Sequence, residues 1–171
     1  MEILPDRVGR LAMIARWKPV HLGHARILRA LADYADTVLI GIGSSNKYDA
    51  DNPFTPAETR EMIELVQPGL SIVEVPDLGH GPRWRAMVVE LLGPLDMFVT
   101  ANSYVRGLLK DDYRVVHPVH LLAPADRIAV NGTMVREAIR GGEPWEHLVE
   151  PPVAEFLRAR GLVERVRSGP L

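Results

Sequence analysis

The sequence contains no cysteine, and its 20 Lys and Arg side chains nearly balance its 22 Asp and Glu side chains. The missing thiols exclude disulfides, cysteine-ligated zinc, iron–sulfur clusters and a cysteine nucleophile. The net charge of -2 gives no broad attraction to phosphate backbones, so we expect no nucleic-acid partner. No apolar run approaches the roughly 20 residues that cross a bilayer, and residues 1–10 lack the apolar centre of a signal peptide. We therefore expect a cytoplasmic protein with no membrane partner.

The composition is that of an ordinary globular chain. Hydrophobic residues make up 47% and charged residues 25% of the 171 residues. This is too apolar for a disordered chain, and the length is typical of one domain. We expect a single domain over residues 1–171, with a core at about 9–160 and short tails.

Short apolar segments of strand length alternate with amphipathic segments of helix length. Strands are expected at 11–15, 37–42, 71–75, 97–100 and 113–116, with a short further strand at 119–122. Helices are expected at about 24–35, 56–66, 83–92, 103–110, 131–142 and 151–160. This alternation predicts an α/β fold with one doubly wound, mostly parallel, Rossmann-like sheet of five to six strands, followed by C-terminal helices. Ligands should bind beyond the carboxyl ends of the strands, where those helices could also pack.

The densest cluster of polar side chains lies between the first expected strand and the first helix. His21 and His24 stand three residues apart and share a face at the helix start, where free backbone N–H groups favour an anion. Arg16 and Lys18 add positive charge, and Gly23 permits close approach of a ligand to the backbone. No nearby carboxylate pair completes a metal site, so the cluster predicts anion binding more than metal binding, although a pair of surface or capping histidines would give the same residues.

A second helix start late in the chain has the same character. Asn131, Gly132 and Thr133 open the helix, and Arg136 lies one turn along on the same face. Backbone amides and a guanidinium suit a second phosphate group. A triphosphate could bridge the two helix starts, although a solvated arginine and a simple helix cap would give the same residues.

Together these motifs resemble the nucleotidylyltransferase superfamily, and most closely its archaeal-type nicotinamide mononucleotide adenylyltransferases. The resemblance runs from Gly9 to about Leu157. The matching motifs are Arg16-x-x-Pro19-x-His21-x-Gly23-His24, Gly41 to Ser44, Asn52 to Thr55, Val75-x-Asp77, Trp84, Asn102, Gly132-Thr133-x-Val135-Arg136, Trp145 to Val149 and Val153 to Phe156.

The resemblance implies transfer of a nucleoside monophosphate from a triphosphate to a phosphate-bearing acceptor, with release of pyrophosphate. His21 and His24 would hold the α- and β-phosphates, and Thr133 and Arg136 the β- and γ-phosphates. Mg²⁺ would arrive with the triphosphate, held largely by phosphate oxygens and water. Copies of the chain could form a homo-oligomer. The catalytic residues implied are His21, His24, Arg136 and Arg16, and the nucleotide-binding residues are Lys18, Gly23, Asn131, Gly132 and Thr133.

The acceptor implied by the resemblance is nicotinamide mononucleotide, with NAD as product. Trp84 matches the tryptophan that stacks on the nicotinamide ring, although a tryptophan within a helix is otherwise most often core. The remaining acceptor-binding residues implied are Asp77, Asn102 and Ser44.

Several residues depart from the family pattern. Lys18 replaces the usual Gln, Gly81 an Asn that contacts the carboxamide, and Met87 a His, while Arg83 and Arg85 add charge beside Trp84. These changes leave open a cytidylyltransferase that acts on a small phosphate or phosphonate. A nucleotide-binding sensor without turnover is a further alternative.

Overall fold

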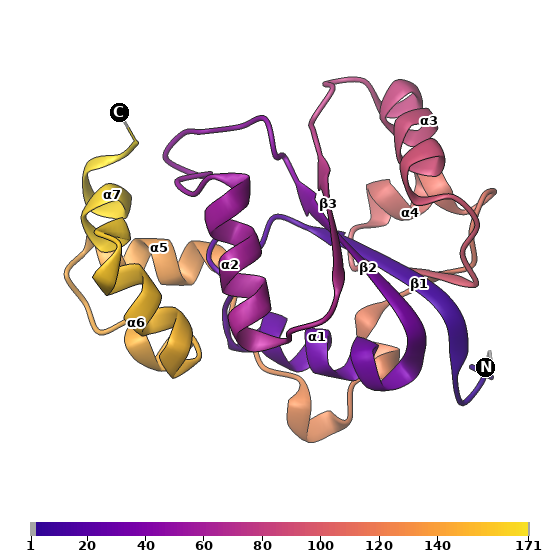
Figure 1. The fold of residues 1–171 in the computed structure, drawn as a ribbon, viewed down its shortest axis with the longest axis horizontal. Helices are drawn as coiled ribbons and strands as arrows, with labels where there is room; N and C mark the ends of the chain where they lie inside the picture. The colour runs from indigo at the N-terminus through magenta and orange to yellow at the C-terminus, as the bar shows by residue number, and fades with distance from the viewer. Residues whose placement is uncertain (1–2, 171) are drawn as a thin grey trace.

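Five parallel strands form the centre of the structure, a computed structural model that describes residues 3–170 (Figure 1). Their order across the sheet is β3-β2-β1-β4-β5. The strands are β1 (Val8–Ala15), β2 (Ala35–Gly43), β3 (Ser71–Val75), β4 (Met97–Val99) and β5 (Val115–Val116). This confirms the predicted parallel sheet and places its first strand in the middle, between β2 and β4.

Helices cover both faces of the sheet, as its apolar strands require. Along β1, Leu11 and Met13 pack into one apolar cluster, whereas Ala12 between them packs into another. The first cluster includes residues of α1 (Leu22–Tyr34) and α2 (Pro56–Val66), and the second includes residues of α3 (Gly81–Leu92) and α4 (Ser103–Leu109). The fold is therefore doubly wound, as predicted.

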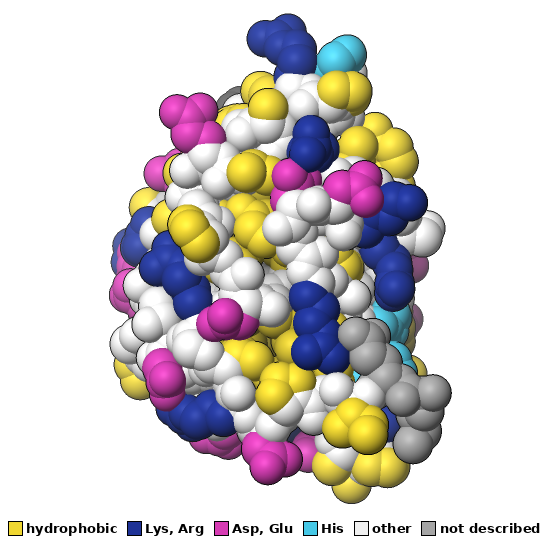
Figure 2. Space-filling model, turned by 90° about the vertical axis from the view of Figure 1, so that its right-hand side faces the viewer, with side chains coloured by type: hydrophobic (Ala, Val, Ile, Leu, Met, Phe, Trp, Pro, Cys, Tyr) yellow, Lys and Arg dark blue, Asp and Glu magenta, His cyan; other side chains and the backbone are white. Residues whose placement is uncertain are grey.

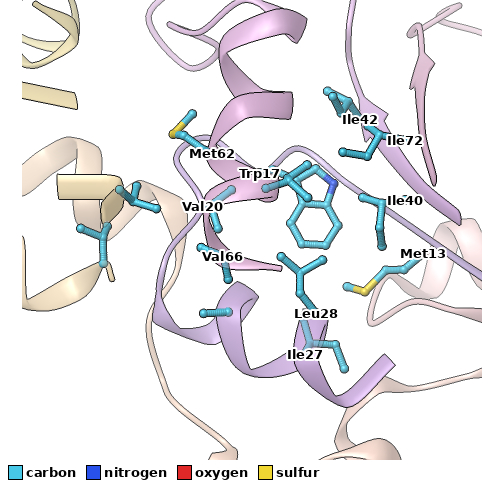
Figure 3. Packing of buried hydrophobic residues seen from close by; sticks show 14 of the residues in the cluster. Met13, Trp17, Val20, Ile27, Leu28, Ile40, Ile42, Met62, Val66 and Ile72 are labelled. Carbon is cyan, nitrogen blue, oxygen red and sulfur yellow. The ribbon is translucent and has the colours of Figure 1, made fainter. Parts of the chain in front are cut away.

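Trp17 fills the core directly beneath the carboxyl end of β1. Its indole is fully buried and lies among side chains from the sheet and from α1 and α2, including Leu28, Ile40 and Met62 (Figure 3). Its Nε1 donates a hydrogen bond of 2.9 Å to the backbone oxygen of Gly41. This anchor fixes the chain between β1 and α1, where the first polar cluster begins.

The expected sixth strand at 119–122 is wrong. The segment Pro118–Leu121 is instead a short 3-10 helix, η1. Pro118 brings no N–H group for a strand ladder, and the His117 imidazole accepts the backbone N–H of Val119 at 3.1 Å, which caps the helical turn. The sheet therefore ends at β5. A second 3-10 turn, η2, covers Pro124–Asp126.

The C-terminal part forms three helices and a 3-10 turn, η3 (Glu146–Leu148). They are α5 (Gly132–Arg140), α6 (Pro151–Ala159) and α7 (Leu162–Ser168). The segment after residue 160, expected as a short tail, instead forms α7, whose Leu162 and Val166 are buried in the core. Helix α6 contacts α2 and helix α7 contacts α5, and the first residues of α5 line a hollow at the sheet's carboxyl edge.

The opposite side of the molecule carries α3 and α4. On the face shown in Figure 2, basic and acidic side chains are interspersed, with apolar groups between them. Within residues 3–170, no helix combines the length and the apolar character needed to cross a bilayer.

Candidate active site

Two hollows open at the carboxyl edge of the sheet, where β1 separates β2 from β4. This is the topological switch point at which open α/β sheets bind ligands. One, the β1–α5 hollow, has a volume of about 250 Å³, and the other, the β1–α3 hollow, about 350 Å³. Arg16, directly after β1, lines both. The two cavities therefore meet at one exposed guanidinium.

Residues from both predicted phosphate-binding helix starts line the β1–α5 hollow. It is lined by Arg16, Trp17, Lys18, His21, His24, Asn131, Gly132, Thr133 and Arg136. The first and last of these residues are 120 positions apart in the sequence and border the same cavity. The predicted convergence of the two polar clusters on one cavity is thus present in the structure.

His21 and His24 form a stacked pair at the start of α1. Their ring centroids are 3.6 Å apart, and Trp17 packs on His24 with centroids 4.5 Å apart. His21 Nδ1 accepts the backbone N–H of His24 at 3.3 Å, and His24 Nδ1 accepts that of His21 at 3.4 Å. This reciprocal capping satisfies two backbone donors and fixes both rings.

Both imidazoles are neutral near pH 7. Burial lowers the pKa of His21 from 6.5 to about 4. Burial, followed by the charge of His21, lowers the pKa of His24 well below 6.5, and the Pro19 carbonyl opposes this only in part. Since each Nδ1 accepts a hydrogen bond, the hydrogen-bond network assigns the remaining proton to Nε2. The pair can therefore donate hydrogen bonds to an anion without carrying charge.

Gly23 does not line the β1–α5 hollow. A Cβ at this position would lie 3.0 Å from His21 Cε1 and 3.3 Å from the oxygen of Val130. Its missing side chain therefore leaves room for the His21 ring. Gly23 instead borders a third cavity, the α1–η1 hollow, of about 340 Å³. Its other lining residues are largely apolar and comprise His117, Pro118, Val119, Leu122, Asp126, Arg127, Ile128 and Ala129.

Arg136 joins the start of α5 to the segment after β1. Its Nη1 donates to the Lys18 oxygen at 2.7 Å and its Nη2 to Thr133 Oγ1 at 3.3 Å, while Asp51 lies 4.0 Å from Nη2. The residue is 7% exposed, and its Nε, which is buried, has no hydrogen-bond partner among the described residues. Burial lowers the pKa of Arg136, but a guanidinium stays charged. A buried cation that lines the hollow is suited to an anionic ligand.

Lys18 is buried and faces the loop after β2. Its Nζ donates to the Ser44 oxygen at 3.1 Å and to Asn52 Oδ1 at 3.3 Å. Burial first, and then repulsion by Arg16, lower the pKa of Lys18 from 10.5 to about 8, against the attraction of Asp49. The ammonium thus holds the loop while it adds a positive charge to the wall of the hollow.

The β1–α3 hollow brings together all the residues predicted to bind an acceptor. Ser44, Asp77, Trp84 and Asn102 line it, together with apolar side chains of β1. Trp84 is half-buried in the first turn of α3, so its ring contributes to the cavity as well as to the core. Asn102 caps α4, and its Oδ1 accepts two backbone N–H groups at 2.9 and 3.1 Å. Its amide nitrogen is the group left for a ligand.

The expected extra charge beside Trp84 is only partly present. Arg85 forms two hydrogen bonds of 2.6 Å with the carboxylate of Asp112. Neither Arg83 nor Arg85 lines the β1–α3 hollow. The hollow is therefore less cationic than the sequence implies. The carboxylate of Asp112, in the loop after α4, supplies this ion pair.

Sequence reasoning gave no role in the site to some residues that build it. Trp17 supports His24, Asn52 holds Lys18, and Thr100 lines the β1–α3 hollow. The position of Trp17 within the first polar cluster could have identified it from the sequence. Asn52 lies near Lys18 only through the fold. In residues 3–170, no group of three or more His, Asp or Glu side chains could hold a metal ion.

Comparisons with known proteins agree with this geometry. The sequence model of the cytidylyltransferase-like family matches residues 13–138. The nicotinamide-nucleotide adenylyltransferase of Thermococcus kodakarensis is 34% identical, over 94% of this chain and 88% of its own length. That of Methanoculleus marisnigri is 32% identical, over 90% of this chain and 93% of its own length.

Solved structures share the fold. A bifunctional NMN adenylyltransferase/ADP ribose pyrophosphatase from Francisella tularensis matches with a TM-score of 0.71 and 17% identity. The match covers 94% of this chain but only 52% of that chain, so this chain spans about half of the bifunctional protein. A second structure of the Francisella enzyme, which contains AMP and a manganese ion, has a TM-score of 0.68.

Proposed function

The chain belongs to the cytidylyltransferase-like family, and from this premise we propose that it is a nucleotidyltransferase that forms NAD and pyrophosphate from ATP and nicotinamide mononucleotide. The observation that carries the proposal is the pair of hollows that meet at Arg16. One is lined by cations and helix starts, the other by an aromatic ring and polar groups. The names of relatives above 30% identity support the choice of substrates.

We assign the triphosphate to the β1–α5 hollow. An oxygen of the acceptor phosphate attacks the α-phosphorus of ATP, and the bond from that phosphorus to the bridging oxygen breaks as pyrophosphate leaves. A phosphate monoester is already ionised near pH 7, so the reaction needs alignment and charge stabilisation more than a base. His21 and His24 donate hydrogen bonds at the α- and β-phosphates. Thr133 and Arg136 bind the β- and γ-phosphates.

We assign the acceptor to the β1–α3 hollow. Its phosphate would lie beside Arg16, the residue shared with the β1–α5 hollow, and its ring would stack on Trp84. Ser44, Asp77 and Asn102 offer polar groups along the same wall. This arrangement directs the acceptor phosphate toward the triphosphate.

The α1–η1 hollow is the proposed site of the nucleobase. It adjoins the start of α1 at Gly23, and largely apolar side chains line it, which suits a flat aromatic base. Since the described residues hold no cluster of carboxylates, Mg²⁺ would be bound mainly by phosphate oxygens and water. It would neutralise charge on the triphosphate.

Cytidylyl transfer to a small phosphonate is the second candidate. The family's name favours it, and the structure weakens it, because Asp112 neutralises the Arg85 charge that suited a compact anionic acceptor. The base itself is not decided by the phosphate-binding residues.

The proposal is tested by offering ATP and CTP with nicotinamide mononucleotide and with a small alkylphosphonate, and identifying products by mass. We expect NAD and pyrophosphate from ATP and nicotinamide mononucleotide. A cytidylylated phosphonate as the main product would establish the second candidate. No pyrophosphate from any pair would indicate a nucleotide-binding sensor. In the same assay, His24→Ala should lower turnover at least about a hundredfold. His147→Ala, at an exposed position outside the hollows, should keep it.

A further inference from the structure

A fourth cavity lies beyond Trp84. This α3–α4 hollow has a volume of about 210 Å³ and shares Asp77, Trp84 and Val105 with the β1–α3 hollow. Arg16 lines only the latter, so the α3–α4 hollow extends the acceptor cavity away from the phosphate-binding region. Gly81 and Tyr104 form its far wall.

The side chain of Tyr104 is exposed, and its backbone is held at the start of α4. It is 65% exposed and occupies the first turn of α4, where its backbone N–H is held by the Asn102 side chain. A Cβ at position 81 would lie 2.3 Å from the Tyr104 hydroxyl oxygen. The hydroxyl therefore rests against the backbone of α3, in a space that only glycine leaves open.

The Tyr104 hydroxyl has no hydrogen-bond partner among residues 3–170. A phenolic O–H can both donate and accept a hydrogen bond. Tyr104 lines the same cavity as Trp84, so the pair offers an aromatic ring for stacking and a polar group in one cavity. An aromatic ring that bears an amide substituent has the complementary chemistry. The carboxylate of Asp77 lines the same cavity and would repel a carboxylate substituent.

We propose that Tyr104 is a specificity-determining residue whose hydroxyl hydrogen-bonds the amide substituent of the acceptor ring stacked on Trp84. The inference rests on the proposed function, because it takes nicotinamide mononucleotide as acceptor. Gly81 is needed for this contact, because any side chain at that position would displace the Tyr104 hydroxyl.

The first test is Tyr104→Phe. We expect the Kd for nicotinamide mononucleotide, measured by calorimetry without ATP, to rise roughly tenfold, as for the loss of one hydrogen bond. The KM for this acceptor should rise in parallel, while the KM for ATP and kcat at saturating acceptor are retained. Tyr48→Phe is the matched control, because Tyr48 lines none of these hollows, and its Kd should equal that of the wild type.

Gly81→Ala provides a second, independent test. The added methyl group must displace the Tyr104 hydroxyl, so the Kd should rise in the wild-type background. In the Tyr104→Phe background, Gly81→Ala should raise the Kd much less, because the hydroxyl oxygen that clashes with the added methyl group is absent. The two substitutions should therefore be non-additive in a double-mutant cycle.

The outcomes separate this inference from the proposed function. An unchanged Kd in Tyr104→Phe, or additive effects in the cycle, overturns the role of Tyr104 and leaves the proposed reaction standing. Wild-type protein that makes no NAD overturns the proposed reaction, and the calorimetric Kd still decides the role of Tyr104. Wild-type protein that binds no nicotinamide mononucleotide overturns both.

Discussion

The imidazoles of His21 and His24 combine a folding role with a proposed binding role. Each Nδ1 accepts a backbone N–H at the start of α1, and this leaves each Nε2 with the proton. Their lowered pKa values follow mainly from burial, as expected for rings stacked on each other and on Trp17. The helix start is thus built from the same atoms that fix the tautomer needed to donate to phosphate.

Replacing His21 should change how folding stability depends on pH. The pKa of His21 is lower in the folded protein, about 4 against 6.5, so the unfolded chain binds more protons in this range. The stability contributed by neutral His21 is complete above about pH 6.5 and is lost as the pH falls toward 4. The full loss is about 3 kcal/mol. His21→Asn keeps a cap but cannot titrate, so its free energy of unfolding in urea should fall less between pH 7 and pH 4.

Equal pH dependence in the two proteins would contradict the buried, neutral state of His21. Burial and tautomer could not be predicted from the sequence, because they depend on Trp17 and on the chain that closes over the ring. The sequence predicted only that two imidazoles share a face at a helix start.

At the scale of elements, the start of α5 is fitted closely to the segment after β1. A Cβ at Gly132 would lie 2.9 Å from the Lys18 oxygen and 3.0 Å from Arg136 Nη1. The missing side chain therefore allows the hydrogen bond that links Arg136 to the Lys18 carbonyl. This contact joins the two phosphate-binding regions.

Gly132→Ala should separate these two elements slightly and lower turnover. The added methyl group has backbone on one side and the guanidinium on the other, so the start of α5 must shift. A misplacement of this size costs up to about a hundredfold in rate. The measurement is the initial rate of pyrophosphate release at saturating substrates.

Gly107→Ala is the matched control, because it lies in α4 with no neighbouring atom within 4 Å. It should keep normal turnover and raise the free energy of unfolding by about 0.5–1 kcal/mol. Normal turnover in Gly132→Ala would show that the close fit at α5 is dispensable.

The sequence predicted most elements because their signals are local. The bounds of β3 and of α2, which follows a Thr55 cap and Pro56, agree with the prediction. Beta strand β1 begins at Val8, three residues earlier than predicted, because its pairing with β2 there does not require apolar residues. The apolar run at 119–122 suggested a strand, but Pro118 and the His117 cap favour the 3-10 helix η1. Helix α7 was not predicted, because the residues after about 160 were expected to form a short tail.

At the scale of the whole molecule, α7 is tied to the start of α2 through Arg165. Its Nη1 donates to Glu58 Oε2 at 2.6 Å, and the same carboxylate oxygen accepts the backbone N–H of Thr55 at 2.9 Å. Both side chains are largely buried, at 26% and 17% exposed. Such a link between distant parts of the chain cannot be deduced from local sequence.

Arg165→Met should therefore lower the free energy of unfolding by about 1–2 kcal/mol, because a charge-assisted, mostly buried hydrogen bond is lost. Arg160→Met removes a more exposed ion pair between α6 and Glu61 of α2 and should change stability by no more than about 0.5 kcal/mol. Urea unfolding of both variants at pH 7 provides the comparison. Equal losses would mean that burial of the Arg165 pair has no energetic consequence.

The position of Arg16 implies a thermodynamic coupling between the two substrates. One guanidinium borders both hollows, so the first anion to bind already offsets part of its positive charge. The second anion is then attracted less strongly by Arg16 and is repelled by the first anion. The coupling free energy between the two substrates is therefore unfavourable. Divalent cations would relieve this antagonism, and each substrate alone should bind more tightly than it does in the presence of the other.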